Sequence, residues 1–457
     1  MSSIARQFGY DPYSSEYEKI GDNYNTNDYL KLRFQPAFIS ALIPTILYLS
    51  LRISKISKLC SILGAVMIIF ENSIITESRI IVMDAFLLFF VSLVIFFTTS
   101  SFKAPTFSIR RFLLFSLSGL ALGCGISTKL TTLGTFMAVG ILQLFQITIL
   151  QKQNKRKLSI LVKDLIFRGV AFLLPIAVII LISYYFHFNI NLYKNSENSR
   201  HSTLFNNKYF DNENFSFPSD HFSYLPFFQT LIELNKVMNK SNMRISSYHI
   251  FASSWAEWPL LNSKAIIFWD SLNEQNLKQQ TDMHDNKESF FVCIGNVFVY
   301  YLVFFLLVSF CIYAILIAFY KLFIFFVRKD DRNTLIFNKL SKISRFNKKI
   351  KNYYPYLFFY SMGYFCNLIP FALINRSAYL YHYFPSLIFG IMFSATLIEI
   401  FLDIFLANFK KIRLLLIISC CLLIFFGWLF FIPFIYSTPI SIKQFEKRVW
   451  GGNWFRL

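Results

Sequence analysis

Charge is scarce in this sequence of 457 residues. Asp, Glu, Lys and Arg make up 15% of it, whereas an ordinary soluble domain contains roughly 25% of these residues. Apolar residues make up 55%, and this balance excludes a soluble enzyme. A helix needs about 20 mostly apolar residues to span a bilayer, so the chain has enough of them for around ten spans.

Several motifs that carry chemistry in soluble enzymes are missing. The 15 glycines are dispersed, and none belongs to the G-x-x-x-x-G-K-[ST] loop that binds phosphates. The seven cysteines lie in or beside apolar stretches and indicate neither a disulfide framework nor a C-x-x-C site. The six histidines lack a metal-ligand spacing such as His-x-x-x-His. We therefore expect no metal and no cofactor.

The apolar residues fall into ten stretches that are separated by polar segments. They cover residues 36–51, 59–75, 80–98, 112–127, 130–150, 166–186, 291–320, 354–374, 383–402 and 414–436. Most of these stretches have the length of a membrane-spanning helix. The sequence therefore predicts an all-α polytopic membrane protein with about ten transmembrane helices.

The formal net charge of +20 is explained by where the charges lie. Lys and Arg gather in alternate loops, at residues 52–58, 103–111, 152–168, 328–351 and 410–413. Because short cytosolic loops concentrate basic residues, these five loops are predicted to face the cytosol. A nucleic-acid partner is not expected, since the basic runs have no interleaved aromatic residues for base stacking.

This topology divides the chain into five parts. They are a lumenal segment at 1–35, a first bundle of about six spans at 36–187, a lumenal loop at 188–290, a second bundle of about four spans at 291–436, and a lumenal tail at 437–457. Within the loop, residues 228–245 have helical apolar spacing and predict an amphipathic helix on the membrane surface or on the bundle. The first segment is acidic and has no apolar leader, so a further span upstream would explain its translocation.

Charged residues at the lumenal ends of the spans suggest a site, because placing charge near hydrocarbon costs a few kcal/mol. Arg79 lies between Glu77 and Asp84, and Asp84 is expected about one turn inside the next helix. Lys129 occupies the turn between the fourth and fifth spans. These residues form either a binding site or turns whose cations simply extend to the interface.

Two aromatic clusters are predicted on the same side. Arg376 and His382 belong to a Tyr-rich turn, which either joins the aromatic belt at the membrane surface or contributes to a site. Trp255, Glu257 and Trp258 precede the seventh span. They form either an interfacial segment or a platform for a sugar or an acceptor chain, since aromatic rings pack on apolar sugar faces.

The motifs follow one another in a specific order. From residue 8 onward they are Phe8-Gly-Tyr, Glu18-Lys-Ile-Gly-Asp22, ENSIITESRIIVMDAFLLFF at 71–90, Ser127-Thr-Lys129 with Leu133-Gly-Thr-Phe136, SSWAEWPLL and IIFW within 253–269, Gly295-Asn296, YLYHYFPSLIFGI at 379–391, and Ser437-Thr-Pro439. In this order and spacing the sequence resembles the protein O-mannosyltransferase family, the endoplasmic-reticulum enzymes that move mannose from dolichyl phosphate to Ser and Thr.

The resemblance implies the C-type glycosyltransferase architecture in the endoplasmic-reticulum membrane, in contact with membrane lipid. It also implies dolichyl phosphate mannose as the donor substrate, Ser/Thr-containing proteins as acceptors, and a dimer with a paralogue. Arg79, Lys129 and Arg376 are then the cations for the lipid phosphate, and His382 is a hydrogen-bond donor to it. Glu77 and Asp84 are expected to orient Arg79.

Two family features do not occur in this sequence. Members open with a further span and a lumenal loop whose Asp-Glu pair is thought to serve the chemistry, and most carry a MIR domain in the long loop. The catalytic carboxylate therefore stays unassigned, with Glu77, Asp84, Glu18 and Asp22 as weaker candidates. The chain alone is expected to transfer little mannose.

Three other functions stay open. The chain could be a non-catalytic subunit of a complete paralogue, an enzyme that uses another lipid-phosphate sugar, or a transporter of lipid-linked or small solutes. A transporter is expected to have charged residues near the membrane midplane and discontinuous helices. Here the charged residues gather at one face, which favours an enzyme.

Overall fold

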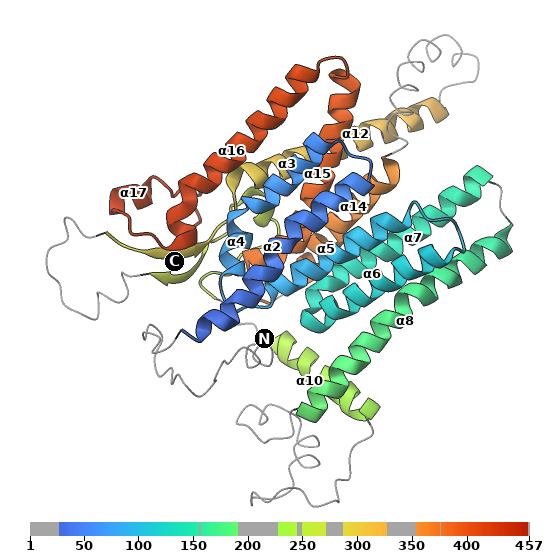
Figure 1. The fold of residues 1–457 in the computed structure, drawn as a ribbon, viewed down its shortest axis with the longest axis horizontal. Coiled ribbons are helices and arrows are strands. Elements are labelled where there is room, and N and C mark those ends of the chain that lie inside the picture. Colours follow the sequence, from blue (N-terminus) through green and yellow to red (C-terminus); the bar gives the residue numbers. More distant parts are fainter. Residues whose placement is uncertain are drawn as a thin grey trace, which may run out of the picture.

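The computed structural model describes residues 27–154, 157–190, 227–244, 249–270, 287–326, 353–374 and 376–455. Glu18, Asp22 and the loop residues 191–226 lie outside this part of the chain. The described residues form a bundle of long helices with one two-stranded sheet at one end (Figure 1).

Nine of the described helical segments are long and apolar enough to cross a membrane, and a bent pair brings the number to ten. The first bundle contains α2 (Tyr29–Ile53), α3 (Lys58–Ile69), α4 (Asn72–Ser78), α5 (Asp84–Ser101), α6 (Ile109–Thr128), η1 (Leu130–Thr132), α7 (Leu133–Asn154) and α8 (Leu158–Ile190). The second contains α12 (Val297–Phe326), α14 (Tyr354–Leu368), η4 (Ile369–Leu373), η5 (Leu380–Tyr383), α15 (Phe384–Phe405) and α16 (Lys410–Tyr436). The predicted helical membrane fold is confirmed.

The second predicted span, 59–75, is broken into α3 and α4, whose axes differ by 54°. Glu71 lies at the break and caps α4: its carboxylate accepts hydrogen bonds from the Ile74 N–H and the Ser73 hydroxyl, both at 2.7 Å. The other carboxylate oxygen accepts from the Asn296 N–H at 2.9 Å. Because such a cap satisfies the free N–H groups of a new helix, it stabilises the bend.

The first bundle is held together by a close contact between α6 and α8. A side chain at Gly119 would collide with the backbone of Phe172, and one at Gly123 would crowd Ile176. Small residues spaced four apart let two membrane helices approach closely. This spacing therefore fixes α8 against the bundle.

The seventh predicted span begins later than its apolar stretch. Residues 290–293 form strand β2 (Phe290–Cys293), which pairs antiparallel with β1 (Ile266–Asp270). Helix α12 starts only at Val297. The prediction of helix over 291–296 is wrong, because apolar composition alone does not distinguish a short buried strand from the start of a helix.

The C-terminal tail packs on this sheet. Ile440 and Glu288 exchange two backbone hydrogen bonds, of 2.9 and 2.8 Å. The buried Trp454 indole N–H donates to the Leu261 carbonyl, just after the short helix η3 (Trp258–Leu260). The tail, including α17 (Ile442–Glu446), and residues 249–270 and 287–293 thus form one cap on the bundle (Figure 1).

The predicted amphipathic helix is confirmed as α10 (Phe227–Arg244). It crosses the end of α8 (Figure 1), where the Tyr184 hydroxyl donates to the Asn235 side chain at 3.1 Å. Leu234, on the apolar side, is buried. The helix therefore packs on the bundle.

The turns of the bundle gather at two ends. The turns near Lys129 and Ala378 lie with the sheet, since Lys129 contacts Asp84 and Ala378 accepts a backbone hydrogen bond from Ser253; we call this the ribbon end. At the opposite end Ser57 donates to Glu399, and the described turns there carry Arg52, Lys55, Lys103, Arg110 and Lys410, so we call it the basic end. This alternation is the one that the charge pattern predicts.

Candidate functional site

An ion pair between Asp84 and Lys129 lies at the centre of the ribbon end. The Lys129 ammonium is 2.8 Å from the Asp84 carboxylate, and the two side chains are 27% and 11% exposed. Lys129 has an extended backbone between α6 and η1. Asp84 is the first residue of α5, so its expected place one turn inside that helix is wrong. A carboxylate in the first turn interacts favourably with the helix dipole.

Two aromatic side chains from η5 lie beside this pair. The Lys129 ammonium lies 4.4 Å from the centre of the Tyr381 ring, a cation–π contact. The buried His382 ring stacks on Tyr381, with centroids 4.5 Å apart. The backbone N and O of Tyr379 each lie 3.1 Å from His382 Nδ1. Because Nδ1 already contacts the backbone of its own turn, Nε2 is the ring nitrogen that can hydrogen-bond to a ligand.

Arg376 adds a second cation to this cluster. Its guanidinium donates to the Asn242 side chain of α10 at 2.9 Å. The positive charges of Arg376 and Lys129 both act on the His382 ring. The site therefore joins the end of α6, η5 and α10. The sequence predicts Lys129, Arg376 and His382 on one side of the bundle, but not the contact with α10.

Glu77 is a second carboxylate close to Lys129. Its side chain is 3% exposed, and its Oε1 atom has no hydrogen-bond partner among the described residues. The charges of both Asp84 and Lys129 act on it. An unsatisfied buried carboxylate oxygen is costly. The Oε1 atom of Glu77 is therefore an available hydrogen-bond acceptor next to the ion pair.

Arg79 has different neighbours. Its guanidinium donates to the Ile435 carbonyl and lies over the rings of Tyr436, at 4.5 Å, and Phe291, at 5.5 Å. Burial lowers the pKa of Arg79, and this effect outweighs the opposing one of Tyr436. The expectation that Glu77 and Asp84 orient Arg79 is wrong, because Arg79 follows the last turn of α4 and contacts the end of α16, while Asp84 pairs with Lys129.

The segment that contains Trp255 and Trp258 packs behind the His382 ring of the site. Trp258 is fully buried, so it does not offer its face to a sugar, and that prediction is wrong. Its indole N–H donates to the Ser253 hydroxyl at 2.9 Å, and its ring lies parallel to His382 with centroids 6.3 Å apart. Glu257 accepts the Ser254 N–H at 3.0 Å and closes the turn. Trp255 is partly buried against the core.

Two contacts that shape the site could not be predicted from the sequence. Tyr381 stands in a quoted motif, but nothing in the sequence indicates that its ring meets Lys129, about 250 residues away. Glu71 and Asn296 are 225 residues apart, and their hydrogen bond fixes the bend before α4. Among the described residues, no three His, Cys, Asp or Glu side chains are grouped to hold a metal ion.

Two family models match the chain. Residues 2–192 match the model for dolichyl-phosphate-mannose-protein mannosyltransferase. Residues 227–454 match the model for the C-terminal four TMM region of protein-O-mannosyltransferase. The first match includes the predicted first bundle, and the second includes part of the predicted loop, the predicted second bundle and most of the tail.

Curated relatives include fungal dolichyl-phosphate-mannose–protein mannosyltransferases. The chain is 31% identical to mannosyltransferase 5 of Candida albicans over 229 residues, which are 50% of this chain and 28% of that protein. It is 32% identical to mannosyltransferase 4 of Schizosaccharomyces pombe over 145 residues, 31% of this chain and 18% of the relative. The matched part spans less than a third of the length of these relatives.

A solved structure has the same fold. It is the Saccharomyces cerevisiae protein O-mannosyltransferase Pmt1–Pmt2 complex bound to the sugar donor, with a TM-score of 0.82 and 16% identity; the match covers 100% of this chain and 85% of that one. The expected glycosyltransferase architecture is thereby confirmed. With both of its halves matched by family models, this multi-pass membrane chain belongs to the protein O-mannosyltransferase family.

Proposed function

We propose that the chain transfers mannose from dolichyl phosphate mannose to Ser and Thr hydroxyls of proteins, at the lumenal face of the endoplasmic-reticulum membrane. The observation that carries the proposal is the Asp84–Lys129 pair beside Tyr381 and His382, at the end of the bundle away from the basic loops. The names of the curated relatives and the donor bound in the yeast complex support this substrate.

In this reaction the bond between the mannose C1 and the phosphate oxygen breaks, and a new bond forms from C1 to the acceptor oxygen. The departing lipid phosphate gains charge, which Lys129 and Arg376 would stabilise through charge-assisted hydrogen bonds. His382 Nε2 would contact the same phosphate or the sugar. The acceptor hydroxyl loses its proton to a carboxylate; Glu77 and Asp84 are the described carboxylates nearest to Lys129.

Arg79 is proposed as a second contact of the donor phosphate. Its half-buried guanidinium lies at the same ribbon end, between α4, β2 and α16. The contacts of Arg79 with Ile435 and Tyr436 also tie α4 to the C-terminal tail. Replacement of Arg79 by Ala therefore tests donor binding only if the tail stays packed.

We also propose that the chain works as a dimer with a paralogue. The yeast structure is a complex of two protein O-mannosyltransferases, and this chain shares their fold. In this assembly the chain is either a transferring subunit or a non-catalytic one. The two roles differ in whether changes at Lys129 stop transfer.

The experiment measures mannose transfer from labelled dolichyl phosphate mannose to a Ser/Thr-rich peptide. Membranes contain the chain alone, a complete paralogue alone, or both, and each arm is repeated with Lys129→Ala. Transfer that depends on the chain and on Lys129 supports a catalytic subunit. Transfer that depends on the chain but not on Lys129 assigns a non-catalytic subunit, and no dependence on the chain in any arm contradicts the proposal.

A transporter is disfavoured by the placement of buried charge. In the part of the chain that the structure describes, the buried ionisable side chains lie toward the ends of helices: Glu71, Glu77, Asp84, Glu288 and His382 at the ribbon end, and Arg111, Asp164, Arg168 and Glu399 toward the basic end. A transport path is expected to place such groups near the midplane and to contain discontinuous helices. The broken span α3–α4 has the second feature, but the buried Glu71 at its break is fully used as a helix cap and as the partner of Asn296.

A further inference from the structure

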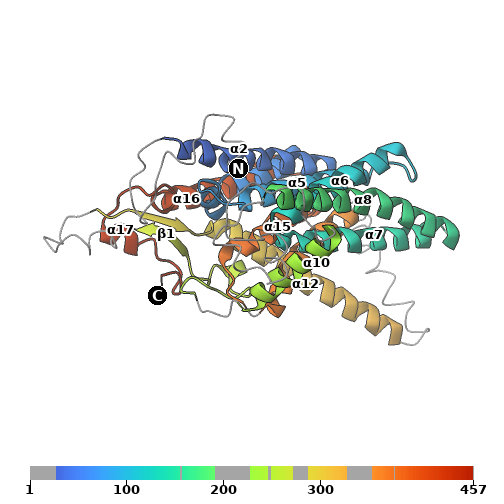
Figure 2. The same ribbon diagram turned by 90° about the horizontal axis from the view of Figure 1, so that it is seen from below.

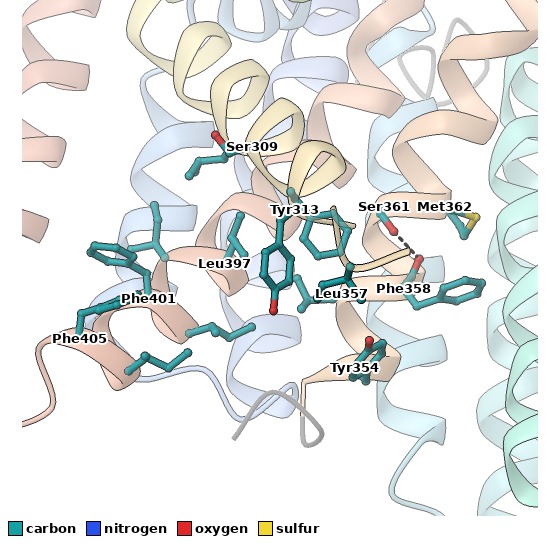
Figure 3. A pocket seen from close by; sticks show the side chains of 16 residues that line it. Ser309, Tyr313, Tyr354, Leu357, Phe358, Ser361, Met362, Leu397, Phe401 and Phe405 are labelled. Atoms are coloured by element: carbon teal, nitrogen blue, oxygen red, sulfur yellow. Dashed lines mark hydrogen bonds between the residues drawn. The ribbon is translucent and has the colours of Figure 1, made fainter. Parts of the chain in front are cut away.

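A cleft of about 630 Å³ lies between α12, α14 and α15 near the basic end (Figure 3). Of the residues that line it, twelve are Leu, Ile, Met or Phe and the other four are two Ser and two Tyr. Figure 3 shows Tyr313 of α12 projecting between Leu397 of α15 and Leu357 of α14. This cleft plays no part in the proposed transfer site.

The cleft forms where α12 and α14 diverge from each other on the surface of α15. Both α12 and α14 pack on α15 but make few contacts with each other, and the second half of α12 runs away from the bundle (Figure 2). Leu357 and Ile400 form a buried floor, whereas Tyr354, Phe401 and Phe405 are more than half exposed at the rim. The cleft therefore opens sideways, toward the membrane.

The walls favour hydrocarbon over water. The Ser361 hydroxyl donates to the Phe358 carbonyl at 3.0 Å, so it offers little to a water molecule. A trapped water needs roughly two to four polar partners, and cavities with apolar walls stay dry or take apolar ligands. In a membrane the available apolar ligand is a lipid chain.

The position of the cleft indicates which lipid. Helix α15 begins at Phe384, beside His382, and first lines the cleft at Leu397; at 1.5 Å per residue, this separates the two regions by about 20 Å. A lipid with its head group at the basic end reaches the cleft directly. The exposed Lys410 and Lys411 follow Phe405 closely, and basic residues at this surface attract anionic head groups.

We propose that this cleft binds one acyl chain of an anionic glycerophospholipid from the cytosolic leaflet. The chain lies on Leu357 and Ile400, and Tyr354 lies at the level of the head group, where tyrosine is favoured. The bound lipid fills the gap between α12 and α14. The proposal is independent of mannosyl transfer and depends on the predicted orientation of the basic end.

The test uses the full chain in membranes that contain phosphatidylserine with a photoreactive diazirine on its acyl chain. Labelled peptides are identified by mass spectrometry and are expected to come from α12, α14 and α15 around the cleft. Ser309→Trp fills the cleft and should reduce this labelling to background. Val308→Trp, an adjacent exposed position outside the lining, is the matched control and should retain it.

Three results would overturn the proposal. Labelling could be spread evenly over the outer helices, including α8; a photoreactive dolichyl phosphate could label the cleft more strongly than the phospholipid; or cross-links could join the cleft to a second protein chain. Met362→Trp provides a second filling variant if Ser309→Trp fails to insert. Mannose transfer is measured on the same membranes, so a loss of activity is distinguished from a loss of lipid binding.

Discussion

Two of the ion pairs among the described residues, Arg168–Asp164 and Lys129–Asp84, differ in how fully their hydrogen-bonding groups are satisfied. Toward the basic end, Arg168 donates twice to Asp164, at 2.9 and 2.7 Å, and once each to Gln143 and Gln146, both at 2.9 Å. Both members of this pair are 1% exposed. At the ribbon end, the Lys129 ammonium makes one hydrogen bond among the described residues, to Asp84, and the side chain is 27% exposed.

The difference separates a structural pair from a binding one. Arg168 uses four of its five guanidinium N–H donors within α7 and α8, so at most one remains for a ligand. Lys129 has donors to spare, an aromatic ring beside it and a neighbouring carboxylate, Glu77, with an unpartnered oxygen. A partly open charge with spare donors can change partners when a phosphate arrives.

Breaking the satisfied pair should have the largest effect. Arg168→Ala leaves Asp164 as an uncompensated buried charge, which typically destabilises a protein by about 3–5 kcal/mol. The amount of folded chain extracted from membranes should fall sharply, as measured by size-exclusion chromatography and thermal unfolding in detergent. Gln146→Ala, at the partly exposed edge of the cluster, is the control and should be tolerated. A well-folded but inactive Arg168→Ala protein would contradict the structural assignment.

Much of the fold could be predicted from sequence because it depends on composition. The ten apolar stretches correspond to the candidate spans. The basic residues in alternate loops predict which turns lie at the same end of the bundle. The details that depend on side-chain contacts could not be predicted: the bend requires Glu71 to meet Asn296, and β2 requires a partner strand at β1. Pairing over such distances in sequence has no local periodicity to reveal it.

The site was predictable as a set of residues but not as an arrangement. Lys129, Arg376 and His382 do come together, because alternate turns of a bundle share one end. The partner of Asp84 could not be read from the sequence: Arg79 is nearer along the chain, yet the break before α4 sends Arg79 toward α16. Trp258 looked available only because burial is invisible in a short aromatic motif.

Removing the open charge should affect chemistry rather than folding. Lys129→Ala is expected to lower mannose transfer by about 10²–10³-fold, the usual loss when one group that stabilises developing negative charge is deleted. Its melting temperature should stay close to that of the unchanged chain, in contrast to Arg168→Ala. Lys129→Arg keeps the charge and the ring contact and should recover part of the rate. If Lys129→Ala unfolds as readily as Arg168→Ala, the two pairs do not differ as argued.

Glu77 tests whether the unpartnered oxygen matters. Glu77→Gln preserves the shape of the side chain but removes its potential negative charge next to Lys129. Transfer should fall by roughly tenfold, equivalent to about 1.4 kcal/mol, because Lys129 is positioned less firmly. The kinetics should distinguish a raised donor KM, expected for a positioning residue, from a loss confined to kcat, expected for the acceptor's base. A fall of three orders of magnitude in kcat alone would assign the base to Glu77.

The smallest effect is expected at the edge of the site, where α10 meets Arg376. Asn242→Ala removes the hydrogen bond of 2.9 Å that holds the guanidinium. A single such bond contributes about 0.5–1.5 kcal/mol net, so the donor KM should rise by roughly two- to tenfold while kcat and folding stay unchanged. Arg376→Ala should raise KM further, since it removes the cation itself. Lys240→Ala, on the exposed side of the same helix, controls for a general change in α10. If Asn242→Ala and Lys240→Ala behave alike, Arg376 does not need α10 to hold the donor, and the loop helix has no share in the site.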